Sequence, residues 1–194
     1  MKTRVAVLIS GAGSNMAALI DAGRAPGSAY EVVLVLANIE DAGGLAVARA
    51  KGVEAAAIAH RPFGRDREAH ETAIDAALRK ARVEVVALAG YMRVLTPWLV
   101  GGWRGRMLNI HPSLLPLYPG LDTHARALSA GDAEAGCTVH LVSEGVDEGA
   151  VLAQARVPVQ ADDTPASLAQ RVLAAEHALY PETLDAFCRS LRDA

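Results

Sequence analysis

A continuous apolar run at residues 5–9 (Val-Ala-Val-Leu-Ile) leads directly into a glycine-rich loop at residues 11–15 (Gly-Ala-Gly-Ser-Asn). A strand without polar positions is typical of a parallel sheet covered by helices, because both of its faces are then buried. A helical pattern follows from about residue 15 to 22. The order of strand, glycine loop and helix therefore indicates an α/β architecture.

The same alternation continues along the chain. The other predicted strands are residues 32–37, 53–59, 83–89, 106–111, 138–142 and 151–159, the last of them an outer strand. The other predicted helices are residues 45–50, 66–82 and a final one that Thr164 caps, that Pro165 opens and that Pro181 is expected to kink or break.

Repeated strand–helix units predict a doubly wound, mostly parallel α/β sheet of Rossmann-like type. No internal repeat or linker divides the sequence, so we expect a single domain over residues 1–194. Right-handed crossovers would place the loops after the first, fourth, fifth and sixth strands along one edge.

Composition narrows the classes of function. Hydrophobic residues make up 52% of the 194 residues and the net charge is −3, with no basic cluster, so neither nucleic acid nor an anionic membrane is an expected partner. Cys137 and Cys188 lack the spacing of metal ligands or of a redox pair, and no apolar segment is long enough to span a membrane. We expect a cytoplasmic protein without a metal, as a monomer or homodimer.

The most informative segment is Met107-Leu108-Asn109-Ile110-His111, followed by two prolines at 112 and 116. Side chains of a strand alternate between faces, so Asn109 and His111 point one way together, opposite Leu108 and Ile110. An amide and an imidazole at the end of a strand can stabilise negative charge that develops on an oxygen. A hydrogen-bonded polar pair that closes the sheet edge is the plainer alternative.

Other polar positions fall at the same edge. Thr138 and His140 share a face of the sixth strand and would extend a pocket wall if that strand neighbours the fifth. Gly13, Ser14 and Asn15 at a helix start suit a single phosphate, although a tight turn without ligand fits them too. Because residue 16 is Met, the dinucleotide pattern G-x-G-x-x-G is incomplete.

An acidic loop and an apolar loop complete the candidate site. An acid beside His111 would raise the pKa of its imidazole and orient the ring, but spacing does not choose between Glu144, Asp147 and Glu148. Residues 91–95 (Tyr-Met-Arg-Val-Leu) could line an apolar slot, with Arg93 facing a polar group. Glu176 borders the buried stripe of the last helix and requires a partner.

These motifs together resemble the folate-dependent formyltransferase family, and within it the glycinamide ribonucleotide formyltransferases. The resemblance spans nearly the whole chain in order, through residues 10–15, 89–95, 108–116, 118–121, 136–140, 146–149 and 176–181. It implies transfer of the formyl group of 10-formyltetrahydrofolate to the glycyl amine of the ribonucleotide, a step of purine synthesis.

The resemblance also implies roles for residues. Asn109, His111 and Asp147 match the family's catalytic residues, with Thr138 and His140 supporting them. The ribonucleotide side matches Gly13, Ser14, Asn15 and Glu176. The folate side matches Arg67, Met92, Arg93, Val94, Leu95, Asn109 and Val142.

Two other functions remain open on the sequence. A deformylase acting on the same folate would release formate without the ribonucleotide amine. A non-catalytic nucleotide-binding module would explain the glycine loop but not the pair Asn109 and His111. The mechanism we expect is a tetrahedral intermediate stabilised by Asn109 and protonated His111, with Asp147 keeping His111 charged.

Overall fold

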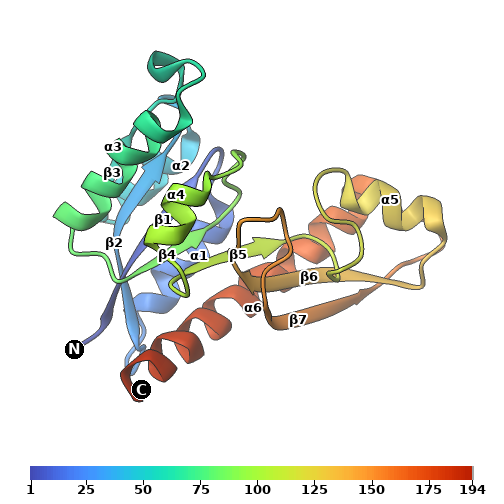
Figure 1. Cartoon of the computed structure of the whole chain (residues 1–194). Helices are drawn as coiled ribbons and strands as arrows, with labels where there is room; N and C mark the ends of the chain where they lie inside the picture. Colours follow the sequence, from blue (N-terminus) through green and yellow to red (C-terminus); the bar gives the residue numbers. More distant parts are fainter. Residues whose placement is uncertain (194) are drawn as a thin grey trace.

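The computed structural model describes residues 1–193, and all its strands belong to one seven-stranded sheet in the order β3-β2-β1-β4-β5-β6-β7 (Figure 1). The strands are β1 (Thr3–Ile9), β2 (Tyr30–Ala37), β3 (Glu54–Ala57), β4 (Val85–Leu88), β5 (Met107–His111), β6 (Glu134–Leu141) and β7 (Val151–Pro158). Strands β1 to β5 are parallel, and β6 and β7 join antiparallel. The predicted doubly wound, mostly parallel sheet is confirmed. Ala194, the last residue of the predicted domain, lies outside the described residues.

Helices cover both faces of the sheet (Figure 1). They are α1 (Ser14–Arg24), α2 (Gly43–Ala50), the 3₁₀ turn η1 (Arg61–Phe63), α3 (Arg67–Lys80), α4 (Pro97–Gly102), α5 (Thr123–Ala130) and α6 (Pro165–Asp193). Helices α1, α2 and α6 share one apolar core with the sheet, and α3 and α4 share the other. Within residues 1–193, no helix combines the length and the apolar character needed to cross a membrane.

Strand β1 contains the continuous apolar run at residues 5–9 and is a central strand buried on both faces. Val5, Val7 and Ile9 pack in the core with α1 and α6, whereas Ala6 and Leu8 pack in the core with α3 and α4. All five side chains are fully buried. A central parallel strand has no solvent face, so each position must be apolar.

Strand β6 corrects one topological prediction. The loop after it does not lie along the edge formed by the ends of β1, β4 and β5, because β6 runs antiparallel to β5 and pairs Leu141 with Leu108. Residues 142–150 therefore leave β6 beside the start of β5, where the Val142 N–H donates to the Met107 carbonyl at 2.8 Å. The segment then folds back over β5. Apolar periodicity identifies a strand but carries no information about its direction.

Helix α6 corrects a second prediction, which concerns the effect of Pro181. Its start is as predicted, since the Ser167 N–H donates to Thr164 Oγ1 at 3.1 Å. Pro181 was predicted to kink or break the helix; the break is wrong, because α6 runs as one element to Asp193. The preceding residue, Tyr180, is fully buried, and its hydroxyl donates to the carbonyls of Leu88 and Leu108 at 3.1 and 3.2 Å. Packing on the sheet holds the turn that lacks one backbone hydrogen bond.

Candidate active site

A cleft of about 580 Å³ opens at the carboxyl ends of β4 and β5 and reaches Asn15 in α1. Four segments line it, residues 90–95, 109–112, 120–123 and 142–147, together with Asn15, Leu88, His140 and Glu176. This volume is in the usual range for sites that bind small molecules. The sheet edge predicted to carry the site is therefore hollowed, and most of the predicted site residues border the hollow.

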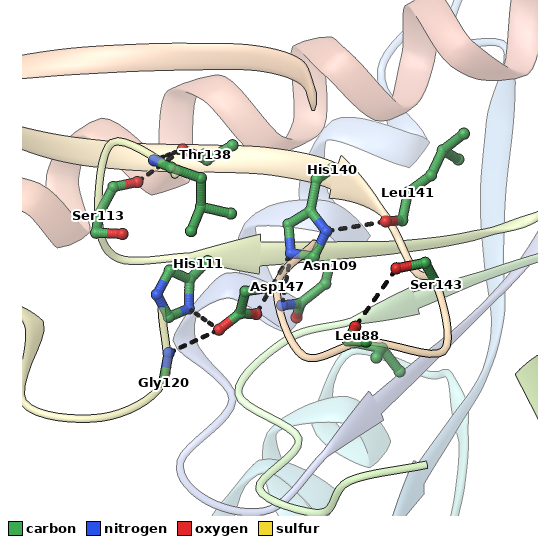
Figure 2. Close-up of polar contacts among 12 residues, drawn as sticks. Leu88, Asn109, His111, Ser113, Gly120, Thr138, His140, Leu141, Ser143 and Asp147 are labelled. Atoms are coloured by element: carbon green, nitrogen blue, oxygen red, sulfur yellow. Dashed lines mark hydrogen bonds and ion pairs between the residues drawn. The ribbon is translucent and has the colours of Figure 1, made fainter. Parts of the chain in front are cut away.

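The end of β5 presents its polar side chains as predicted. Leu108 and Ile110 pack in the core with α6, while Asn109 and His111 lie on the opposite face and border the cleft. Near these two residues the loop 142–147 passes over the strand (Figure 2). Their polar groups thus face a ligand-sized space rather than a packed interior.

His111 is 6% exposed and lies between two oxygen acceptors. Its Nδ1 is 3.3 Å from Asp147 Oδ2, and its Nε2 is 2.9 Å from the Tyr118 carbonyl oxygen (Figure 2 shows the first contact). A neutral imidazole has a single N–H and can satisfy only one of the two acceptors. Both ring nitrogens of His111 thus lie beside oxygen acceptors, and the ring is oriented from both sides.

Asp147 is the acid that the loop brings to His111. Burial by itself raises the pKa of this carboxyl, but His140, the Gly120 N–H at 2.9 Å and the charge of His111 outweigh burial and hold the pKa below its usual value. The backbone of Asp147 is left-handed, with φ at 57°, which Asp tolerates better than most residues. Glu144 and Glu148, the alternatives from spacing, are exposed.

His140 joins this cluster from β6. The register pairs it with Asn109, and its Nε2 lies 3.2 Å from Asn109 Nδ2 and 3.6 Å from Asp147 Oδ1. Its Nδ1 lies 2.9 Å from the Leu141 carbonyl. His140 is therefore a common neighbour of the amide and the carboxylate, and the predicted extension of the pocket wall is correct for this residue.

Thr138, predicted to share that wall, does not border the cleft. Its hydroxyl donates to the Ser113 carbonyl at 2.7 Å and accepts the Leu115 N–H at 3.0 Å. It thereby fixes the loop that follows β5, in which the Leu115–Pro116 bond is cis. Thr138 positions the backbone beyond His111 rather than facing a ligand.

The glycine loop meets α6 at the other end of the cleft. Gly13 precedes α1 with φ at 74°, and a Cβ there would lie 3.1 Å from the Gly44 Cα, so the loop and α2 approach closely. Asn15 Nδ2 donates to Glu176 Oε2 at 2.6 Å. Burial raises the pKa of Glu176, and the Asn15 hydrogen bond offsets this only in part. Gly13 and Ser14 lie beyond the residues that line the cleft.

The partner expected for Glu176 is therefore a side chain 161 residues away in sequence, and it is neutral. Asn15 Oδ1 is buried and has no hydrogen-bond partner among the described residues. A carboxylate and an amide oxygen at one end of the cleft are acceptors for ligand hydroxyls or N–H groups.

The apolar loop, residues 91–95, also lines the cleft. Met92 and Val94 are 65% and 54% exposed, although both are hydrophobic, and Leu95 is buried. Arg67, at the start of α3, lies outside the residues that line the cleft, but its Nη1 donates to the Val94 carbonyl at 3.3 Å. Exposed apolar side chains at the rim of a cleft are a common feature of binding sites.

Sequence reasoning missed the segment 120–123 as part of the site. The Gly120 N–H binds Asp147, and the carbonyl of the nearby Tyr118 binds His111. The sequence Tyr-Pro-Gly at 118–120 marked a turn, but which backbone groups a turn directs at a distant side chain is a tertiary property. Within residues 1–193, no group of three or more His, Cys, Asp or Glu side chains could hold a metal ion.

This fold and site define a class: a doubly wound α/β protein with an Asn, a His and an Asp around a cleft at the end of a central strand. The chain matches the Formyl transferase family model over residues 3–184 and belongs to that family.

Individual relatives agree with the family. Over 94% of its length, the chain is 50% identical to "Trifunctional purine biosynthetic protein adenosine-3" of Drosophila melanogaster, of which it spans 14%. It is 44% identical to "Phosphoribosylglycinamide formyltransferase" of Escherichia coli strain K12, covering 94% of this chain and 86% of that protein. The crystal structure of "Phosphoribosylglycinamide formyltransferase from Brucella melitensis" superposes with a TM-score of 0.93 at 53% identity, covering 97% and 96% of the two chains.

Proposed function

We propose that the chain transfers the formyl group of 10-formyltetrahydrofolate to the glycyl amine of glycinamide ribonucleotide, a step of purine synthesis. The observation that carries the proposal is the contact of His111 with both Asp147 and the Tyr118 carbonyl, beside Asn109. A charged imidazole and an amide donor around one point suit a reaction that places negative charge on an oxygen. The names of the bacterial relatives support the choice of substrates.

The reaction begins when the substrate amine attacks the formyl carbon. The carbonyl oxygen of the resulting tetrahedral intermediate takes the negative charge, and the Asn109 amide and the His111 imidazolium stabilise it. In comparable sites one such donor lowers the activation barrier by about 3–4 kcal/mol. Asp147 keeps His111 charged, and it relays the proton of the amine through water to the folate nitrogen, which leaves as its bond to the formyl carbon breaks. Each charge has a side-chain partner, so the scheme needs no metal and no covalent enzyme intermediate.

The ribonucleotide binds at the glycine-loop end of the cleft in this proposal. Gly13 and Ser14 at the start of α1 hold the phosphate with backbone N–H groups, which a helix N-terminus offers to anions. Asn15 and Glu176 receive the ribose hydroxyls. The buried pair at 2.6 Å and the unpartnered Asn15 oxygen, counted over the described residues, support this placement.

The folate binds at the other end. Its pterin ring lies in the slot formed by Met92, Val94, Leu95 and Val142, and Arg93 faces a polar group of the ring. Asn109 meets the formyl group, and Arg67 lies toward the outer end of the folate. The exposed apolar side chains of Met92 and Val94 support this part of the proposal. We also propose that the protein is cytoplasmic, acts on small molecules alone and is a monomer or a homodimer.

A substrate-dependence assay tests the function. Purified protein is mixed with 10-formyl-5,8-dideazafolate, and release of the deformylated folate is followed by absorbance with and without glycinamide ribonucleotide. We expect release only when the ribonucleotide is present. Release without it, together with formate, would identify a deformylase. Absence of release from folded protein would favour a binding module.

A further inference from the structure

The slot loop, residues 91–95, is held only in part by its own apolar side chains, because Leu95 and Tyr91 pack in the core with α3 and α4 while Met92 and Val94 do not. Met92 and Val94 are mostly exposed, so their burial contributes little to the position of the backbone. A loop with exposed apolar side chains should gain by turning them inward. Something else must keep these side chains directed at the cleft.

Glu71 supplies one of the constraints. It lies on α3, is 3% exposed, and accepts the Thr96 N–H at 2.9 Å with one oxygen and the Thr96 hydroxyl with the other. Thr96 is the residue between the slot loop and α4, and within the described structure its own side chain does not cap that helix. Both groups of Thr96 are donors, which suits a carboxylate. A buried carboxylate is costly unless it is well hydrogen-bonded, so this contact fixes where the loop ends.

The other end of the slot loop is held in a similar way. The Met92 N–H donates to Ser10 Oγ at 2.8 Å, and the Ser10 hydroxyl donates to Asn38 Oδ1 at 2.6 Å. Between the two ends, Arg67 binds the Val94 carbonyl. Polar side chains therefore hold the backbone of the slot loop at both ends and at Val94, while the side chains of Met92 and Val94 stay exposed at the cleft.

We propose that Glu71 is a positioning residue for the folate subsite, acting through Thr96 to hold the slot loop ready for the pterin ring. The proposal rests on the proposed function for the identity of the ligand. Preorganisation of this kind lowers the cost of binding the substrate that the loop contacts. We expect little effect on the ribonucleotide, because its proposed partners Asn15 and Glu176 are held by their hydrogen bond to each other and not by Glu71 or Thr96.

Helix α3 also provides a matched control. Asp75, one turn after Glu71, accepts the Trp103 Nε1–H at 2.8 Å at the end of α4. Glu71 and Asp75 thus join the same two helices, one beside the slot loop and one away from it. A merely structural role would make their variants behave alike.

The test compares Glu71→Gln with Asp75→Asn by steady-state kinetics with 10-formyl-5,8-dideazafolate and glycinamide ribonucleotide. Loss of one charge-assisted hydrogen bond should raise KM for the folate about tenfold in Glu71→Gln, with KM for the ribonucleotide unchanged and kcat within about threefold. Asp75→Asn should lower Tm and change neither KM. An unchanged folate KM in Glu71→Gln, or equal changes in both KM values, would overturn the proposal.

Thr96 gives a second pair in case Glu71→Gln does not fold. Thr96→Ser keeps both donors and should behave as wild type, whereas Thr96→Val loses the hydroxyl and should weaken folate binding. Calorimetric titration with 10-formyl-5,8-dideazafolate alone distinguishes failure of the positioning role from failure of the proposed function. Wild type that binds the analogue as weakly as Thr96→Val overturns the positioning role only, and wild type that does not bind it overturns the proposed function as well.

Discussion

Asp147 Oδ2 lies 3.3 Å from His111 Nδ1, and the Tyr118 carbonyl lies 2.9 Å from the other nitrogen of the same ring. The imidazole is therefore held between two oxygen acceptors, and its side chain is almost fully buried. In the proposed mechanism the ring carries a proton on both nitrogens, and a donor held in this way stabilises an oxyanion without reorganisation at the moment of reaction. The mechanism proposed for this chain depends on that relationship.

The first prediction concerns turnover. Asn109→Ala, His111→Ala and Asp147→Ala should each lower kcat by about 10²–10³, because each removes a group that acts mainly on the transition state. Circular dichroism should show that the fold is kept. Leu108→Val is the control on the same strand, since Leu108 faces the core with α6; it should cost about 1 kcal/mol in stability and leave kcat near wild type. A His111→Ala variant with near-normal kcat would remove the basis of the mechanism.

The second prediction concerns acid stability. The folded pKa of Asp147 lies below its usual value of 3.8, so the native state binds fewer protons than the unfolded chain between the two values. The stability that Asp147 contributes is then fully present above about pH 4 and is lost as pH falls through the folded pKa. Asp147→Asn should show a shallower fall of the free energy of unfolding in this interval. The control Glu148→Gln, at an exposed neighbour, should follow wild type.

Much of the fold could be predicted from the sequence because each buried strand is a nearly pure apolar run. Residues 5–9 and 83–89 required burial on both faces, and the glycine loop required a turn into a helix. Strand direction was not encoded in that pattern, so the return of the loop after β6 over β5 was not foreseen. The break expected at Pro181 does not occur, because Tyr180 is anchored on the sheet by contacts that local propensity does not include.

The candidate site, like the fold, could be predicted from the sequence only in part. Alternation alone placed Asn109 and His111 on one face, since a strand has only two faces to offer. Period-two alternation did not separate Thr138 from His140, because which of them meets the cleft depends on where the loop after β5 runs. The choice of Asp147 among three acids, and the roles of Glu71 and the Tyr118 carbonyl, depend on tertiary contacts between distant segments.

The third prediction concerns Glu176. Its folded pKa is raised above the usual value of 4.5, so stability is lost as pH rises from 4.5 through the folded pKa. Glu176→Gln keeps an acceptor for Asn15 and has no carboxyl to ionise, so it does not lose stability as pH rises. Its Tm at pH 7 should therefore be higher than that of wild type. KM for the ribonucleotide should rise about tenfold through loss of a charged acceptor. Glu182→Gln, at an exposed position of α6, should change neither value. A Glu176→Gln variant with a lower Tm would contradict this account.

The fourth prediction concerns closure of the loop over β5. A Cβ at Gly149 would lie 1.6 Å from the Leu141 carbonyl oxygen and 3.4 Å from His140 Nδ1, so Gly149→Ala cannot keep this backbone path. Displacement of the loop would move Asp147 away from His111, and we expect both Tm and kcat to fall. Gly101→Ala is the control in α4, where a Cβ meets no described atom within 4 Å; it should raise stability by about 0.5–1 kcal/mol. Normal kcat in Gly149→Ala would show that Asp147 need not be held by this loop.

The central claim is that the formyl carbon moves to the ribonucleotide amine in the cleft around Asn109, His111 and Asp147. The most direct measurement follows a ¹³C-labelled formyl group from 10-formyl-5,8-dideazafolate by NMR, with glycinamide ribonucleotide present and wild type compared with His111→Ala. The account predicts that wild type places the label in the formamide of the ribonucleotide and that His111→Ala leaves it on the folate. Label recovered as formate, or equal transfer by both proteins, would contradict it.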